Sequence, residues 1–251
     1  MTPDILTSVL ATPGLVWLVL TISVAGIVRG FTGFGTALIF VPVANIFLPA
    51  ADVIAITMLV GFGGSAALLP RALKVAEVKD VSILGGAAIL TVPLGLWVMT
   101  QLPQDAIRWT AAVIAFAMLS ALVLGWRYRG RIDMKRLLGI GAAGGAIGGM
   151  TGLTGPAVIL FYLANGSRAE IVRANTILFL AMLDVVIVAN MTIGGLITWQ
   201  MVALGLFLAV PYFLTARVGQ GMFDPKYEKT YRTMAYLVIA LAVATGLPIW
   251  D

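Results

Sequence analysis

The sequence predicts an all-α membrane protein made of two inverted repeats, each with a broken or re-entrant helix pair followed by three transmembrane helices. Composition is the first observation: 61% of the 251 residues are hydrophobic and only 11% are charged, which is far from the balance of a soluble domain. The second observation is a series of uncharged apolar runs, each close in length to the ~20 residues needed to cross a bilayer. The third is a glycine-rich interruption at matching positions in the two halves, which is typical of transporters built from repeats.

The apolar regions follow the same order in both halves. A broken region at 14–48 precedes apolar runs at 53–70, 81–102 and 109–126, and a broken region at 137–164 precedes runs at 177–197, 199–216 and 234–250. We therefore divide the chain into a first repeat at 1–126, a cytoplasmic linker at 127–135 and a second repeat at 136–251. The N-terminus lacks the basic segment of a signal peptide, so we expect it to belong to the mature protein.

The two interruptions are related motifs. The first is Gly30-Phe31-Thr32-Gly33-Phe34-Gly35, and the second is Gly149-Met150-Thr151-Gly152-Leu153-Thr154-Gly155-Pro156. The residues that follow recur 120 positions later, with Ala37, Ile39, Ala44 and Asn45 matched by Ala157, Ile159, Ala164 and Asn165. Asp52, Pro93 and Arg108 likewise recur in order as Glu170, Pro211 and Arg232. Paired broken helices commonly surround a substrate site, so transport is the leading interpretation.

The distribution of Lys and Arg favours re-entrant breaks over complete crossings. If all the apolar regions crossed the membrane, the basic loop residues would be divided 8 against 7, and the usual cytoplasmic excess would vanish. If each broken region enters and leaves on one side, 14 basic residues share one face and Arg108 stands alone on the other. The half-helix expected at 14–28 is also short for a full span. We expect residence in the cell (inner) membrane with both termini extracytoplasmic.

Backbone N–H groups left free at the breaks predict a site for a small anion. Helices that begin near Thr36 and Pro156 would present unpaired N–H groups and the positive ends of their dipoles to one point. The glycines and hydroxyls expected to line the site are Thr32, Gly33, Gly35, Thr36, Thr151, Gly152, Thr154 and Gly155. Asn45 and Asn165 lie further along, and each amide is a candidate either for the ligand or for a neighbouring helix.

Arg29 and Asp184 are the charged residues inside apolar regions. Arg29 precedes the first break, and we interpret it as an anion ligand because an unpaired charge in the membrane is costly. It could instead snorkel to the interface or pair with a structural carboxylate. The second half has Gly148 at the corresponding position. Asp184 either balances Arg29, caps a neighbouring helix or carries protons that couple transport.

Several classes of chemistry are excluded. The chain has no cysteine and no histidine, which removes thiol, imidazole, zinc and iron–sulfur chemistry, so we expect neither an enzyme nor a bound metal or cofactor. The net charge of +5 comes from short loops and indicates membrane orientation rather than nucleic-acid binding. Gly141, Gly145 and Gly149 recur every four residues and predict close helix packing.

With these motifs in view, the chain resembles the sulfite exporter TauE/SafE family of membrane permeases. The resemblance rests on the length, the duplicated halves, the first glycine motif followed by Pro42, and Gly152-Leu153-Thr154-Gly155-Pro156. It implies a secondary transporter of small sulfur-containing anions such as sulfite, thiosulfate or an organosulfonate like sulfoacetate, with protons as a candidate coupling ion. An anion channel of the same architecture is the alternative, and oligomeric state and transport direction stay open.

Overall fold

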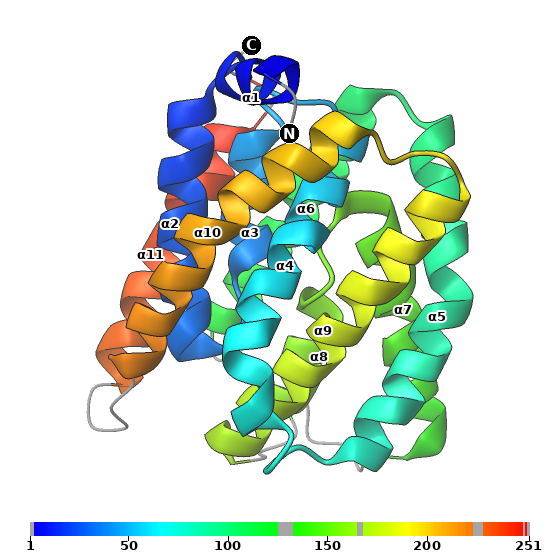
Figure 1. Cartoon of the computed structure of the whole chain (residues 1–251). Helices are drawn as coiled ribbons and strands as arrows, with labels where there is room; N and C mark the ends of the chain where they lie inside the picture. Colours follow the sequence, from blue (N-terminus) through cyan, green and yellow to red (C-terminus); the bar gives the residue numbers. More distant parts are fainter. Residues whose placement is uncertain (1–2, 125–132, 165–167, 223–227, 248, 250–251) are drawn as a thin grey trace.

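The computed structural model describes residues 3–124, 133–164, 168–222, 228–247 and 249, and these residues form helices without any strand (Figure 1). In chain order the helices are α1 (Pro3–Leu10), α2 (Leu15–Thr32), α3 (Thr36–Ala44), α4 (Ala50–Ala72), α5 (Val78–Gln101), α6 (Gln104–Val123), α7 (Met134–Thr151), α8 (Pro156–Ala164), α9 (Ala169–Ile193), α10 (Trp199–Gly221) and α11 (Glu228–Gly246). Each predicted apolar run falls largely within a helix, and the short helix α1 was not predicted. Most of the predicted linker, residues 127–132, lies outside the described residues.

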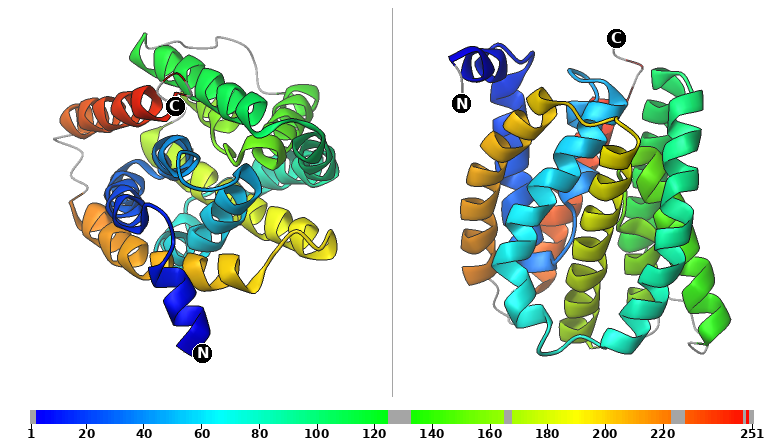
Figure 2. Two further views of the ribbon diagram at one scale, coloured as in Figure 1. Left: turned by 90° about the horizontal axis from the view of Figure 1, so that it is seen from above. Right: turned by 45° about the vertical axis from the view of Figure 1, so that its right-hand side comes forward.

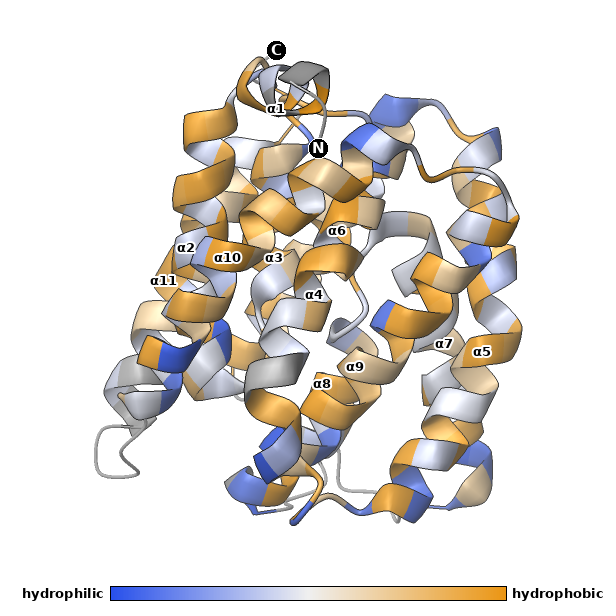
Figure 3. Ribbon diagram, viewed as in Figure 1, coloured by the Kyte–Doolittle hydropathy of each residue, from blue (hydrophilic) through white to orange (hydrophobic). Residues whose placement is uncertain are grey.

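The helices are those of a multi-pass membrane protein. Five of the described helices, α2, α5, α6, α9 and α10, are long and apolar enough to cross a bilayer, and α4 and α11 contain shorter apolar stretches at 50–65 and 233–246. Apolar residues cover the length of the outer helices, while hydrophilic residues gather at the two ends of the bundle (Figure 3). This banding matches a hydrocarbon core with polar layers on either side.

The two predicted breaks are present. Helix α2 stops at Thr32 and α3 begins at Thr36, while α7 stops at Thr151 and α8 begins at Pro156. The expected helix starts are therefore confirmed. Both helices before a break contain 18 residues and both helices after a break contain 9 residues.

The expected length of the first half-helix was wrong. We expected it to end at residue 28, but α2 continues through Arg29 and Gly30 and is itself long enough to span a membrane. Gly30 does not interrupt the helix because its missing side chain is used for packing: a Cβ atom there would overlap the carbonyl oxygen of Ala216 in α10. Several basic residues that were counted with the loops also lie within helices, among them Arg108 in α6 and Arg173 in α9.

The broken helices return toward the end of the bundle from which they come. Helix α2 runs inward from the end that carries both termini, and α3 runs back toward that end (Figures 1 and 2). Helix α7 starts at the opposite end, and α8 returns toward it (Figure 1). The α4–α5 connection lies at this second end. The short helices α3 and α8 are buried inside the bundle for most of their length (Figure 2).

Glycines allow the two most extensive helix–helix contacts to be close. Helix α7 packs along α5, and Gly141, Gly145 and Gly149 form the predicted stripe. Cβ atoms at these positions would overlap the backbone of α5, as would be expected where small residues let two helix backbones approach. Helix α2 packs along α10 in the same way through Gly26 and Gly30. Each broken helix is therefore held mainly by a helix of the other half.

We predict that Gly145→Ala destabilises the protein by about 1–3 kcal/mol, the usual range for forcing extra atoms into a filled contact. The added methyl group would overlap the carbonyl oxygen of Ala88. Gly139→Ala on the same helix is the matched control, because nothing lies within 4 Å of a Cβ atom there. Thermal unfolding of the purified protein in detergent measures both. Equal stability of the two variants would contradict the assignment of Gly145 to a tight helix contact.

Candidate functional site

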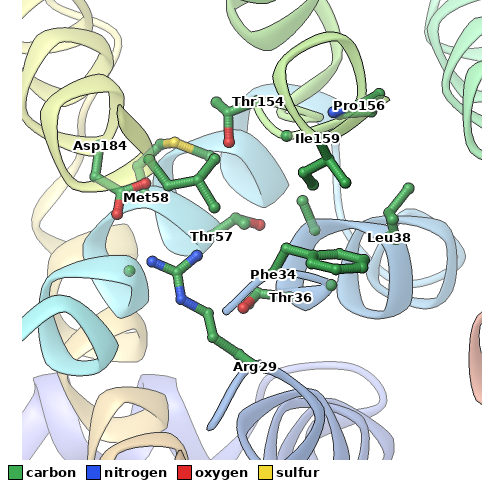
Figure 4. A pocket seen from close by; sticks show the side chains of 15 residues that line it. Arg29, Phe34, Thr36, Leu38, Thr57, Met58, Thr154, Pro156, Ile159 and Asp184 are labelled. Carbon is green, nitrogen blue, oxygen red and sulfur yellow. The ribbon is translucent and has the colours of Figure 1, made fainter. Parts of the chain in front are cut away.

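The two breaks face one cavity inside the bundle (Figure 4). Side chains and backbone from α2, α3, α4, α8, α9 and both breaks surround it. The lining residues are Arg29, Phe34, Gly35, Thr36, Ala37, Leu38, Thr57, Met58, Gly61, Thr154, Gly155, Pro156, Ile159, Leu180 and Asp184. The cavity therefore unites residues from both halves of the sequence.

Each break is turned by a glycine in a left-handed conformation. Gly33 follows α2 with a φ of 84°, and Gly152 follows α7 with a φ of 77°. Their N–H groups donate to the carbonyl oxygens of Arg29 and Gly148, both at 2.8 Å, and so close the final turn of each helix. Only glycine adopts this conformation without strain, which explains the same residue at the same point of both motifs.

The threonine before each of these glycines stabilises the break from within. The Thr32 hydroxyl donates to the carbonyl oxygen of Val28 at 2.7 Å and accepts from the Phe34 N–H at 3.1 Å. Thr151 makes the equivalent bonds to Ile147 and Leu153, at 2.8 and 3.2 Å. Thr32 and Thr151 are not among the residues that line the cavity, and neither are Gly33 and Gly152. These four candidate ligands shape the loops instead.

The residues that follow do reach the cavity. Gly35, Thr36, Thr154 and Gly155 all line it, and helices α3 and α8 begin there with their first N–H groups free of partners in their own helix. The Thr154 hydroxyl points inward (Figure 4). The Thr36 hydroxyl shares a hydrogen bond with the hydroxyl of Tyr212, which is fully buried on α10.

Arg29 extends into the cavity rather than toward the surface. Only 4% of the residue is exposed, and its guanidinium group points into the cavity on the side where Asp184 lies (Figure 4). Its Nε and Nη2 atoms are buried and have no hydrogen-bond partner. Snorkelling to the membrane interface is therefore ruled out. Burying a guanidinium group with two unpaired nitrogen atoms is costly, so its position favours a ligand.

Asp184 faces Arg29 from α9. It is also 4% exposed, and its Oδ2 atom is buried without a hydrogen-bond partner. Ser65 and Arg29 are its polar neighbours, but Arg29 and Asp184 form no ion pair within 4.0 Å. Gly61 makes room for the carboxylate, because a Cβ atom there would overlap Oδ2.

The asparagines differ from the other candidates. Asn45 is buried at the C-terminal end of α3, does not line the cavity, and has an Oδ1 atom without a partner. It thus lies at the far end of the helix whose start faces the cavity. Asn165 lies outside the described residues.

Sequence reasoning missed three lining residues of α4 and one support of the first break. Thr57, Met58 and Gly61 face the cavity from a run that was interpreted only as a span, although the polar Thr57 and the glycines after it were a usable signal. Arg173, assigned to a loop, donates from Nη2 to the carbonyl oxygen of Gly30 at 2.6 Å. Nothing in the local sequence indicates that contact.

Among the described residues, no group of three or more His, Cys, Asp or Glu side chains could hold a metal ion.

Comparison with known proteins adds a family. The model of the family described as Sulfite exporter TauE/SafE matches residues 18–246, which includes both breaks and every helix that lines the cavity. No curated protein and no solved structure matches the chain. Members of the matched family are membrane transporters rather than enzymes. With nearly the whole chain covered, the protein belongs to the TauE/SafE sulfite exporter family.

Proposed function

We propose that the protein is a secondary transporter of small sulfur-containing anions and that it binds them in the cavity between the two helix breaks. One observation carries the proposal: the buried Arg29, whose Nε and Nη2 atoms lack a hydrogen-bond partner, lines the same cavity as the starts of α3 and α8. These features supply positive charge and N–H donors around one cavity of a membrane protein.

Sulfur oxyanions suit this set of donors. Sulfite, thiosulfate and sulfonates carry several oxygen atoms directed away from one sulfur atom, and each oxygen accepts hydrogen bonds. One guanidinium group can bind two of those oxygens side by side. The free N–H groups at Thr36 and near Pro156, with the hydroxyl of Thr154, would bind the others. The membership in a sulfite exporter family supports the same class of substrate.

We further propose that the two halves are inverted repeats that rock against each other around this cavity. Helix lengths are equal across the breaks, α2–α3 and α7–α8 turn back toward opposite ends of the bundle, and the main contacts pair α2 with α10 and α7 with α5. The repeats would span 1–126 and 136–251, joined by the linker at 127–135. The excess of basic residues near one end supports a cytoplasmic position for that end, with both termini extracytoplasmic.

Asp184 is our candidate for coupling transport to protons. Its carboxylate faces Arg29 across the cavity and is shielded from water, so binding or loss of a proton changes the net charge that an incoming anion meets. In this scheme a proton on Asp184 removes a negative charge from the wall and favours the anion. A proton and an anion would then cross together.

We predict that Arg29→Ala lowers the uptake of labelled sulfite or thiosulfate into proteoliposomes at least about tenfold, since hydrogen bonds to charged groups contribute about 1.5–3 kcal/mol. Arg168→Ala is the matched control, because that side chain is 79% exposed. Undiminished uptake by Arg29→Ala would discard the proposed site. Turnover well above about 10³ per second would indicate the alternative, an anion channel.

We predict that Asp184→Asn removes the acceleration of uptake by an inward proton gradient and leaves measurable exchange without a gradient. The amide keeps the shape of the side chain but cannot exchange a proton. Asp105→Asn, an exposed position in the first turn of α6, serves as the control. A gradient response that persists in Asp184→Asn would assign the coupling to another group.

A further inference from the structure

The cavity has opposite charges on facing walls, and this bears on which sulfur anions it prefers. Arg29 projects from α2 and Asp184 from α9, and each has buried polar atoms without hydrogen-bond partners. The two groups do not join in an ion pair within 4.0 Å. A ligand that occupies the cavity therefore meets a hydrogen-bond donor on one side and an acceptor on the other (Figure 4).

An anion that has no hydrogen-bond donor of its own can pair with Arg29 but not with Asp184. Its oxygens pair with Arg29, but nothing in it can donate to Asp184, so the carboxylate either stays buried next to a second negative charge or has to take up a proton. Leaving one member of a buried charged pair without a partner is strongly unfavourable. A ligand that carries its own N–H or O–H donor satisfies both walls, and a site built around such a donor discriminates sharply against analogues that lack it.

The remaining walls fit a short hydrocarbon segment. Met58, Ile159 and Leu180 line the cavity with Phe34 and present apolar surface. Such side chains add no hydrogen bonds to an inorganic oxyanion, but they contact methylene groups favourably. The polar groups, in contrast, gather at Arg29, at the helix starts and at Asp184.

We propose that the preferred ligand is a short alkanesulfonate with a hydrogen-bond donor, such as a hydroxyl group, at its other end. The sulfonate oxygens would bind Arg29 and the helix starts, and the hydroxyl group would donate to Asp184. This inference rests on the proposed function and makes Asp184 the residue that determines specificity. Hydrogensulfite is a smaller anion that also carries a hydrogen-bond donor, in this case on the sulfur group itself. For an anion without a donor, a proton on Asp184 replaces the missing hydrogen bond, so the two roles of Asp184 apply to different ligands.

The test compares two anions of equal charge and equal heavy-atom number. In 2-hydroxyethanesulfonate a hydroxyl group stands where 1-propanesulfonate has a methyl group. Titration calorimetry of the purified full-length protein measures the Kd of each. We expect the wild type to bind the hydroxylated anion at least about tenfold more tightly, from one hydrogen bond to a charged group. Asp184→Leu should abolish that preference, and Asp184→Asn, which keeps an acceptor oxygen, should retain part of it.

Each outcome decides between defined alternatives. Equal Kd values in the wild type overturn the inference, as does a preference that Asp184→Leu leaves unchanged. Sulfite or thiosulfate binding without either sulfonate also overturns it but leaves the proposed function standing. If no sulfur anion binds or crosses the membrane, the proposed function fails and the inference fails with it. Should Asp184→Leu not fold, the wild-type comparison and Asp184→Asn still decide the question.

Discussion

The structure depends on one constraint: a helix interrupted inside a membrane protein must find partners for its backbone groups within the protein, because hydrocarbon supplies none. The C-terminal ends of α2 and α7, which precede the breaks, meet this constraint locally: Gly33 and Gly152 close the last turns, and a threonine hydroxyl binds the loop of each break. Arg173 adds a donor from α9 to the first break. The helix starts on the other side of each break keep their N–H groups for the cavity.

The same constraint explains why each broken helix lies against the opposite half. Glycines bring α2 against α10 and α7 against α5 so closely that a single methyl group would overlap the facing backbone. Dispersion contacts between closely packed backbones are a main source of helix association in lipid, where the hydrophobic effect between helices is absent. The walls of the cavity therefore come from both halves. In the proposed transport cycle, a small rotation of one half against the other would change the site directly.

The two repeats that we propose differ at the two charged positions of the cavity. The position of Arg29 corresponds to Gly148 in the second half, and the position of Asp184 corresponds to Ser65 in the first, each at a spacing of 119 residues. Each charge therefore has an uncharged counterpart. A symmetric pair of arginines would favour highly charged anions, whereas one arginine facing one carboxylate favours a ligand that is both an anion and a donor. This asymmetry is the basis of the specificity that we propose.

The sequence by itself determined the class of protein, the order of the apolar helices, the positions of both breaks and the presence of the charge of Arg29 inside an apolar region. These features are local: run length, glycine clusters and an isolated charge are legible without knowing which helices meet. Only the tertiary structure decided which motif residues face the cavity, because Thr32 and Thr36 differ in role through hydrogen bonds that their spacing does not reveal. The contribution of α4 and the contact of Arg173 with Gly30 join residues far apart in the chain. Such long-range contacts arise from how helices pack, which is a property of the whole bundle and not of any one segment.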